Sequence, residues 1–420
     1  MLLQKPAFLL FYHARAAEAS FGEWLGVLWH GLSLDCTVAG YVTAFPVLVA
    51  LASFWIPLSQ RVWRIVLTVY FSLIALVTAA IFAVDLNLYG YWGFRLDGSV
   101  LIYLSDPGEA LASASWGEVL RQILIMLVYA GAMIWSYRWI LRLFRVEPVP
   151  LRGRIVPTVA TLLIGGLTFL AIRGGVTVAT ANVSKVYFSS NMFLNHAATN
   201  PVFSFLSSVG DNENYAEAYP FFEEERRKTL FEELRGNRPG ADAGTPRLLR
   251  SDRPNVVLIL LESFGRTIMD ETVNGEPVMP NMQRFKREGV WFENFFANSF
   301  RTDRGQVAVL CGFPAQTTMS IMKLPRKSAT LPSLARSLGR EGYRSVFMYG
   351  GDLNFTNQAS FMYSTGWEEL IWQKDMQLDA PTSKWGYADD VVVDLFGDEV
   401  EALGRAEQPF LAGLLTLSSH

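Results

Sequence analysis

A single threonine lies inside a strongly polar stretch that separates two apolar ones. Residues 298–307 read NSFRTDRGQV, and an apolar helical pattern follows. The neighbours of Thr302 are all charged: Arg301, Asp303 and Arg304. If a helix begins at this point, its free N–H groups and its dipole favour an anion beside the hydroxyl. The alternative is an ordinary threonine N-cap, with Asp303 in the first turn and both arginines solvated.

The chemistry that these residues could support is attack on a phosphoryl group. A bound metal ion would lower the pKa of the Thr302 hydroxyl and make it a nucleophile without a histidine base. The guanidinium groups of Arg301 and Arg304 could offset the negative charge of the phosphoryl group. Thr302 is therefore the first candidate for a catalytic residue, and both arginines are candidates for substrate binding.

Polar side chains also follow the predicted strands of an α/β domain. Three apolar runs are typical of buried parallel strands and lie at 255–261, 345–350 and 410–417. They lead into Glu262, Asp352 and His420, respectively. Helical patterns at 280–290, 305–312, 331–342 and 388–403 separate the strands, which predicts a mainly parallel sheet with helices on both faces.

The carboxyl ends of parallel strands meet at one edge of the sheet, where such folds bind ligands. Two carboxylates and an imidazole at that edge would suit a hard or borderline cation and an anionic substrate. Each residue also has a plainer interpretation. Asp352 could be a turn or helix-cap residue in GGDLN, and His420 taken alone could be structural or exposed. The convergence of the three favours a site.

The first half of the chain has the composition of a membrane protein. The 420 residues are 51% hydrophobic and only 18% charged, and a bilayer-spanning helix needs about 20 apolar residues. Four segments meet this length, at 36–56, 63–84, 119–144 and 155–172. Buried core helices are the alternative, but four such segments without a strand pattern between them favour membrane spans. A partial first span is expected near 6–12, and residues 19–34 could lie along the membrane interface.

Loop charges predict the orientation of these spans. The loops near Arg61 and Arg145 are short and basic, whereas the long loop at 86–118 carries four acidic residues against Arg95. Positive-inside bias places the short loops in the cytoplasm, so everything after about residue 175 is expected outside.

The net charge of −3 argues against nucleic-acid binding. A disulfide between Cys36 and Cys311 is not expected.

Composition divides the chain into three parts. Residues 1–175 form the predicted transmembrane domain, and residues 176–253 an extracellular or periplasmic linker. Within the linker, residues 214–234 have the pattern of a charged amphipathic helix, and residues 235–254 are rich in Gly and Pro. The α/β domain is expected over residues 254–420.

Several motifs, taken in order, resemble a known family. They are PNVVLILLESFG, MPNMQRFKREGVWFENFFANSFRTDRGQVAVLCGFPAQ, LPSLARSLGREGYRSVFMYGGDLNF and LTLSSH. They resemble the sulfatase-like domain of the lipoteichoic acid synthase family, whose members are membrane-anchored phosphoglycerol transferases of the alkaline phosphatase superfamily. GLSLDCTVAGY and NMFLNHAATNPVFS in the membrane half look like the same family.

The resemblance implies roles for individual residues. Glu262 would be a metal ligand, and Thr302 the metal-bound nucleophile that carries a phosphoglycerol intermediate. Asp352 and His420 would hold the substrate headgroup. The Trp and Arg that contact phosphate in the family are not matched in DLNFTNQAS, which leaves Asn354 as a polar candidate and the headgroup open.

The resemblance also implies cofactors and partners. The metal would be Mn²⁺, with Zn²⁺ or Mg²⁺ as alternatives. The donor would be a membrane phospholipid such as phosphatidylglycerol, the acceptor a glycan or another cell-envelope molecule, and the location a bacterial-type cytoplasmic membrane with the catalytic domain outside.

One departure from the family concerns the end of the chain. The family completes its metal site with an Asp-His pair downstream of the last histidine matched here, so we expect a domain truncated at its C-terminal end, with an open strand edge.

A phosphoethanolamine transferase and a sulfatase-like hydrolase are alternatives to a phosphoglycerol transferase. Cys311 in CGFPAQ does not fit the C/S-x-P-x-R context of sulfatases. A non-catalytic sensor or binding protein with a degenerate site is the remaining alternative.

Overall fold

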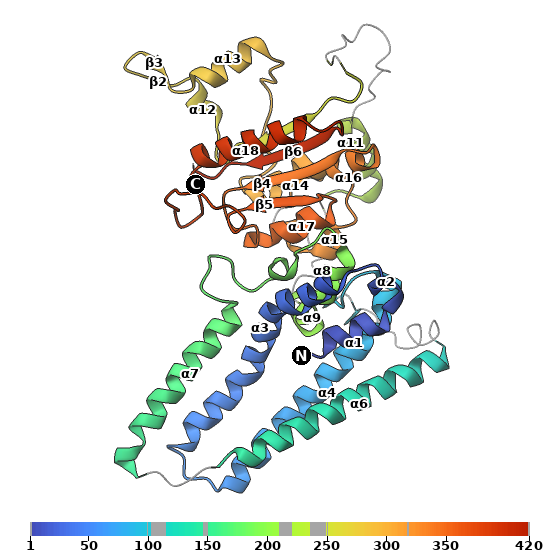
Figure 1. The fold of residues 1–420 in the computed structure, drawn as a ribbon, viewed down its shortest axis with the longest axis vertical. Helices are drawn as coiled ribbons and strands as arrows, with labels where there is room; N and C mark the ends of the chain where they lie inside the picture. Colours follow the sequence, from blue (N-terminus) through green and yellow to red (C-terminus); the bar gives the residue numbers. More distant parts are fainter. Residues whose placement is uncertain are drawn as a thin grey trace.

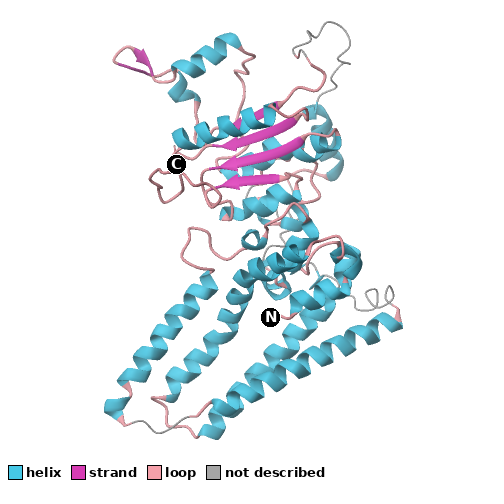
Figure 2. Cartoon of the chain, viewed as in Figure 1, coloured by secondary structure: helices cyan, strands magenta, loops and turns pink. Residues whose placement is uncertain are grey.

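The structure is a computed structural model that describes residues 2–98, 100–101, 115–145, 150–209, 221–235, 249, 251–316 and 319–418. Long helices form one half of the molecule and an α/β domain forms the other, as Figures 1 and 2 show. This order confirms the predicted fold class, which was four apolar helices followed by an α/β domain with a parallel sheet.

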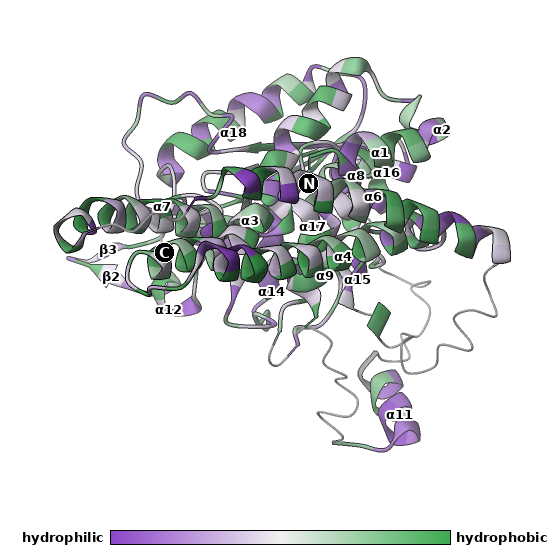
Figure 3. Ribbon diagram, turned by 90° about the horizontal axis from the view of Figure 1, so that it is seen from below, coloured by the Kyte–Doolittle hydropathy of each residue, from purple (hydrophilic) through white to green (hydrophobic). Residues whose placement is uncertain are grey.

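Four helices among the described residues are long and apolar enough to cross a membrane. They are α3 (Phe21–Ser53), α4 (Gln60–Trp92), α6 (Trp116–Leu143) and α7 (Ile155–Arg173). They contain the four predicted spans apart from a few terminal residues. α3 packs along α7 and α4 packs along α6. Many large apolar side chains of all four helices are exposed, and the colours in Figure 3 show that hydrophobic residues predominate along them. Length and composition therefore indicate a membrane protein.

Two expectations concern the N-terminal region. Residues 19–34 do not form a separate interfacial helix, because α3 starts after Ser20 and continues without a break into the first span. A capping box fixes that start: the Ser20 hydroxyl accepts from the Glu23 N–H at 3.3 Å, and the Glu23 carboxylate accepts from the Ser20 N–H at 2.7 Å.

The partial first span expected near 6–12 is α1 (Gln4–Phe11), with α2 (His13–Ala16) after it. Eight residues rise only about 12 Å, which is far short of a bilayer core of about 30 Å. Phe8 and Leu9 are instead buried against protein. The N-terminus lies at the end of the long helices that faces the α/β domain (Figure 1).

Short helical elements cover that end of the long helices. η3 (Val183–Val186), α8 (Met192–Ala198) and α9 (Pro201–Ser208) each begin at an asparagine whose side chain accepts from the first turn: Asn182, Asn191 and Asn200. Together with α1 they form what we call the apical layer. η3, α8 and α9 lie within the segment predicted as a linker, so part of that segment is a packed structure.

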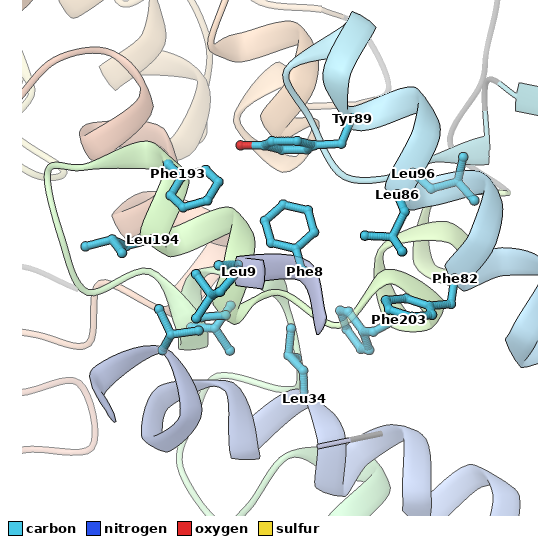
Figure 4. Close-up of a cluster of buried hydrophobic side chains, with 14 of the residues drawn as sticks. Phe8, Leu9, Leu34, Phe82, Leu86, Tyr89, Leu96, Phe193, Leu194 and Phe203 are labelled. Atoms are coloured by element: carbon cyan, nitrogen blue, oxygen red, sulfur yellow. The ribbon is translucent and has the colours of Figure 1, made fainter. Parts of the chain in front are cut away.

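The apical layer shares one hydrophobic core with α3 and α4. Figure 4 shows Phe8 of α1 between Tyr89 of α4 and Phe193 of α8. Ring centroids are 4.8 Å apart for Phe8 and Tyr89 and 5.7 Å apart for Phe8 and Phe193. Contacts of this kind add to the stabilisation from burial alone.

Two buried ion pairs accompany this core. Lys5 Nζ lies 2.6 Å from Asp35 Oδ1, and the same oxygen accepts from Asn200 Nδ2 at 2.7 Å. Arg95 Nη2 lies 3.0 Å from Asp85 Oδ2, and the other Asp85 oxygen accepts from the Leu96 N–H at 2.8 Å. The first pair joins α1, α3 and α9, and the second fixes the chain that leaves α4.

The predicted amphipathic helix over 214–234 is described only in part. α11 (Glu224–Arg235) is helical and its described side chains are almost all exposed, and residues 214–220 lie outside the described part.

Both cysteines are free, with Cys36 exposed and Cys311 buried, which confirms that they do not form a disulfide.

The α/β domain is built on a parallel sheet of order β1-β6-β4-β5. The strands are β1 (Val256–Leu260), β6 (Phe410–Leu415), β4 (Arg344–Tyr349) and β5 (Glu369–Trp372). Leu415 pairs with Leu260 on one side and with Tyr349 on the other, so three strands end at the same level. β1, β4 and β6 confirm the three predicted strands, whereas β5 was not predicted.

Helices cover both faces of the sheet. One face carries α14 (Thr302–Cys311), α16 (Leu334–Arg340) and α17 (Gln358–Ser364), and the other carries α18 (Asp389–Gly404). With α13 (Pro280–Glu288), these confirm the predicted helices, and α17 is an addition. The remaining short elements are η2 (Leu151–Gly153), α12 (Arg266–Met269), β2 (Thr272–Val273), β3 (Glu276–Pro277), η4 (Ile321–Lys323), α15 (Pro325–Ser328) and η5 (Phe355–Asn357).

β1 is an edge strand, and one of its faces is exposed. Val257, Ile259 and Leu261 are 47%, 50% and 40% exposed, whereas the alternate residues pack on the core of the opposite face. Among the described residues, β1 pairs with β6 alone.

The buried Lys5–Asp35 pair yields a prediction about stability. Replacing Asp35 with Ala leaves the Lys5 ammonium buried without its counter-ion, which we expect to lower the free energy of unfolding by about 3–5 kcal/mol. Unfolding of the protein in detergent micelles, followed by circular dichroism, measures this change.

The control is Glu224→Ala, which removes the partner of Lys228 from a pair whose side chains are about 70% exposed. That change is expected to alter the free energy of unfolding by less than about 1 kcal/mol. Equal effects of the two substitutions would contradict the role given to the buried pair.

Candidate functional site

Thr302 and Glu262 are in direct contact, although 40 residues separate them in sequence. Glu262 follows β1 and Thr302 is the first residue of α14. The Thr302 hydroxyl donates to Glu262 Oε2 at 2.6 Å. Thr302 is not the N-cap, because Arg301 holds that position and its side chain makes no capping bond. The plain N-cap interpretation of the threonine is therefore wrong, since its hydroxyl points to a carboxylate instead.

The end of β6 holds the backbone of Glu262 in place. The Glu262 N–H donates to Thr416 Oγ1 at 2.8 Å, and the Thr416 N–H donates to the Leu260 carbonyl at 3.0 Å. The Ser263 hydroxyl donates to the second carboxylate oxygen, Oε1, at 3.1 Å. Ser263 has a φ of 53°, a left-handed conformation that is rare for a residue other than glycine. The carboxylate is thus held by neighbours on both sides.

Tyr349 lies among three carboxylates at the ends of the strands. Burial, followed by the charges of Glu262, Asp352 and Asp389, raises the pKa of the Tyr349 phenol well above its usual value. The phenol is therefore neutral at physiological pH and able to donate a hydrogen bond. The Asp389 carboxylate accepts from the N–H groups of Leu417 and Ser418 at 2.7 and 2.8 Å, which fixes the chain after β6.

Asp352 and Asn354 form a turn after β4. Asp352 Oδ1 accepts from both the backbone N–H and the side-chain amide of Asn354, each at 2.9 Å. The Asn354 carbonyl in turn accepts from Asn182 Nδ2 of the apical layer at 2.8 Å. The contacts of Asp352 are therefore those of a turn residue. Asp352 also lies near Tyr349, which places it at the same edge of the sheet as Glu262.

The two arginines differ in their surroundings. Arg301 is exposed and its guanidinium lies 5.8 Å from the ring centroid of Phe300. Arg304 is 8% exposed and Asp303 is 5% exposed, so both side chains point into the α/β domain. The alternative interpretation with two solvated arginines therefore does not hold for Arg304. Arg301 is the exposed member of the pair.

Some residues at this edge were not found from the sequence, and one predicted residue is not placed. Tyr349, Thr416 and Asp389 were missed, although Tyr349 and Thr416 lie at the ends of strands that were predicted. His420 lies outside the described residues. A polar residue within or just after a predicted parallel strand is the signal that could have identified Tyr349 and Thr416.

The described residues supply only part of a metal-binding site. Glu262 and Thr302 offer a carboxylate and a hydroxyl oxygen within 2.6 Å of each other, a donor pair that suits a hard or borderline divalent cation. Within the described ranges, no group of three or more His, Cys, Asp and Glu side chains lies close enough together to hold a metal. The two residues thus fit a metal as part of its ligand set.

Two cavities adjoin the turn that contains Asp352. The first, of about 540 Å³, is lined by Asp352 and Asn354 together with Lys374 and Lys384. The second, of about 530 Å³, lies between the apical layer and the α/β domain and includes Arg301. Both reach Val178, in the chain between α7 and η3. The candidate site therefore opens toward the membrane half of the molecule.

Comparison with known proteins places the α/β domain in a class. Residues 254–420 match the family described as Sulfatase. The chain is 35% identical over 181 residues to phosphoglycerol transferase I of Xanthomonas campestris pv. campestris, a match that covers 40% of this chain and 25% of that protein. Phosphoglycerol transferase I of Salmonella paratyphi B is 28% identical over 175 residues, covering 40% and 23%.

Two solved structures are also similar over this region. An alkaline phosphatase superfamily protein from Vibrio parahaemolyticus shares 29% identity and a TM-score of 0.38, over 41% of this chain and 42% of that one. A lipoteichoic acid synthase from Listeria monocytogenes shares 21% identity and a TM-score of 0.38, over 40% and 41%.

Residues 254–420 are therefore similar to the Sulfatase family, and proteins named phosphoglycerol transferase I are among their relatives. We call this matched region the sulfatase domain. This confirms the family resemblance at that level. The chain spans about a quarter of the length of the curated relatives that it matches.

Proposed function

We propose that the protein transfers a phosphoglycerol-type headgroup from a membrane phospholipid, such as phosphatidylglycerol, to a glycan or another acceptor of the cell envelope. The observation that carries the proposal is the 2.6 Å hydrogen bond from the Thr302 hydroxyl to Glu262. Relatives of the sulfatase domain named phosphoglycerol transferase I support the same reaction class, and the four apolar helices supply access to a lipid.

The proposed reaction has two steps on one residue. Thr302 Oγ1 attacks the phosphorus of the headgroup, the bond from phosphorus to the diacylglycerol oxygen breaks, and that oxygen takes up a proton. A hydroxyl of the acceptor then attacks the same phosphorus, and Thr302 Oγ1 leaves and is protonated again. Before the first attack Glu262 orients the threonine oxygen, because its carboxylate accepts the hydroxyl hydrogen.

The helix that begins at Thr302 supports this assignment electrostatically. The ten residues of α14 direct the free N–H groups of their first turn toward the space beside the hydroxyl. Those groups and the helix dipole stabilise negative charge on a phosphoryl group bound there. Arg301 adds a cation at the same helix end.

A divalent metal is part of the proposal, with Glu262 and Thr302 among its ligands. Members of this superfamily generally use divalent metals. We propose Mn²⁺, with Zn²⁺ or Mg²⁺ as alternatives. When bound, the ion would lower the pKa of the hydroxyl and offset phosphoryl charge.

A sulfatase-like hydrolysis through Cys311 is less well supported. Cys311 ends α14 whereas Thr302 begins it, so about 14 Å of helix separates the two residues. Burial raises the pKa of the Cys311 thiol to about 11, which keeps it protonated and unreactive. A phosphoethanolamine transferase would use Thr302 in the same way and is the closer alternative.

Substitution of Thr302 tests the nucleophile. In membranes that contain the protein, phosphatidylglycerol labelled in its headgroup should leave label covalently bound to the chain. Thr302→Ala removes the attacking oxygen, so we expect no bound label and a transfer rate lower by at least about 10³-fold. Denaturing gel electrophoresis followed by mass spectrometry of the labelled peptide measures the adduct.

The matched control is Thr330→Ala, because Thr330 is an exposed threonine of the same domain. This variant should retain the label. Label that persists on the Thr302→Ala chain would rule out Thr302 as the nucleophile.

Substitution of Glu262 tests the metal proposal independently of activity. Glu262→Ala removes an oxygen ligand, and changes even to groups around metal ligands typically weaken binding by about 10–100-fold. We expect Mn²⁺ affinity to fall by at least about tenfold, measured by equilibrium dialysis and elemental mass spectrometry. Asp270→Ala, which removes an exposed carboxylate of the same domain, should leave affinity unchanged. Unchanged affinity in Glu262→Ala would refute the assignment.

The proposed location is a bacterial cytoplasmic membrane, with the sulfatase domain on its outer side. The loop between α3 and α4 and the start of α4 carry Arg61 and Arg64, and Arg142 and Arg145 lie near the end of α6. Positive-inside bias places this end of the helices in the cytoplasm. The α/β domain lies at the opposite end (Figure 1).

Reporter fusions test this orientation. Alkaline phosphatase, which is active only outside the cytoplasm, should be active when fused after residue 240 and inactive when fused after residue 58. The two fusions control for each other, since both carry the same reporter on the same chain. The reverse pattern would overturn the orientation.

A further inference from the structure

We propose that the cavity between the apical layer and the sulfatase domain is the binding site for the phosphodiester headgroup of an anionic phospholipid, which it presents to Thr302. This inference rests on the proposed function and names the place where the donor binds. The cavity has a volume of about 530 Å³ and is walled by both halves of the molecule. The argument starts from its charge.

Cations dominate the lining of this cavity. One acidic side chain, Asp97, faces five basic ones, which are Arg95, Arg301, Lys323, Arg326 and Lys327. The chain as a whole carries a net charge of −3, so this surplus of positive charge is local. A concave site lined by one sign of charge concentrates ligands of the opposite sign.

Three residues of the lining also carry buried polar atoms without partners. Arg95 is 5% exposed, and although its Nη2 pairs with Asp85, its Nε and Nη1 have no hydrogen-bond partner among the described residues. His196 Nε2 and Asn357 Oδ1 also lack a hydrogen-bond partner among the described residues, and their side chains are 5% and 9% exposed. Buried donors and acceptors without partners are costly, so a ligand with phosphate and hydroxyl oxygens that drew these side chains toward the cavity would relieve that cost.

His196 is a neutral hydrogen-bond donor in the lining of the cavity. Its Nδ1 lies 3.1 Å from the Tyr89 hydroxyl, and with that hydroxyl donating, the ring proton lies on Nε2. Burial, followed by the charges of Arg95 and Arg15, lowers the pKa of His196 to about 3. The imidazole thus offers an N–H to a phosphate oxygen without adding charge.

Several features favour a lipid over a free phosphate ion. Apolar side chains lie among the polar ones in the lining, including Phe94, Phe203 and Phe355. Phe94 follows the end of α4, and Phe203 belongs to α9, which packs on α3 and α4. The cavity therefore begins at the ends of membrane-spanning helices. Arg301 lies at its other side and directly precedes Thr302.

The two halves of the molecule are joined at the rim of the cavity. Arg326 Nη1 contacts both carboxylate oxygens of Asp97, at 3.1 and 3.3 Å, and its guanidinium lies 4.3 Å from the centroid of the Trp92 ring. Asn182 Nδ2 donates to the Asn354 carbonyl at 2.8 Å. These contacts hold the sulfatase domain on the apical layer, so a headgroup in the cavity stays close to the start of α14.

Binding is best measured in the Thr302→Ala protein, where no transfer takes place. The purified protein in detergent is titrated by microscale thermophoresis with dioctanoyl phosphatidylglycerol, dioctanoyl phosphatidylcholine, glycerol 3-phosphate and inorganic phosphate. We expect phosphatidylglycerol to bind at least about tenfold more tightly than the other three, because it alone combines the anionic headgroup with apolar chains.

Variants of the lining locate the site. Lys323→Met and His196→Leu should each weaken phosphatidylglycerol binding by about tenfold, the loss expected for one charge-assisted or buried hydrogen bond. His196→Gln restores an N–H donor and should recover most of the affinity. Lys286→Met removes an exposed lysine elsewhere on the same domain and should change nothing.

The possible outcomes separate the two proposals. Unchanged binding in both Lys323→Met and His196→Leu, or an equal loss in Lys286→Met, would overturn the cavity as the site. Tight binding of inorganic phosphate or glycerol 3-phosphate in place of the lipid would overturn the assignment to a phospholipid. Lys323 is exposed, so its replacement tests the site even if a His196 variant fails to fold. Binding without any transfer by the unsubstituted protein would refute the proposed function and leave this site standing.

Discussion

The arrangement of the molecule depends on two charges buried where the long helices end. Asp35 of α3 and Asp85 of α4 are each paired with a cation from another segment, Lys5 and Arg95. A buried carboxylate tolerates few alternative positions, because any movement that separates the pair leaves a charge uncompensated. The two pairs therefore fix α1 and the chain after α4 against the membrane helices. The apical layer built on them is the surface that carries the sulfatase domain.

The sulfatase domain positions its candidate site by a different means. Parallel pairing places the ends of β1, β6 and β4 at one level, and the short links that follow them carry Glu262, Thr416 and Asp352. The helix N-terminus at Thr302 is brought to this edge by apolar residues of α14, such as Val307 and Leu310, that pack on the sheet. Backbone pairing and core packing thus set the distance between two side chains that are remote in sequence.

Much of this could be predicted from the sequence. Continuous apolar runs predict β1, β4 and β6, and long apolar runs predict α3, α4, α6 and α7, since each pattern reflects burial on all sides or contact with lipid. β5 was missed because its four residues, ELIW, are too few for a pattern. The apical layer was missed because its asparagines, which look like linker residues, serve as helix caps. The pairing of Lys5 with Asp35, and of Thr302 with Glu262, depends on tertiary structure that no local pattern contains.

The contacts of Asn182 and Arg326 with their partners have a consequence for reaction kinetics. Because they tie the sulfatase domain to elements joined directly to the four apolar helices, they fix the position of Thr302 relative to the ends of those helices. A lipid donor would then reach it by lateral diffusion in two dimensions, and its effective concentration would be its mole fraction in the leaflet. An acceptor dissolved in the surrounding water would arrive in three dimensions. The two substrates of one site would thus obey different concentration scales.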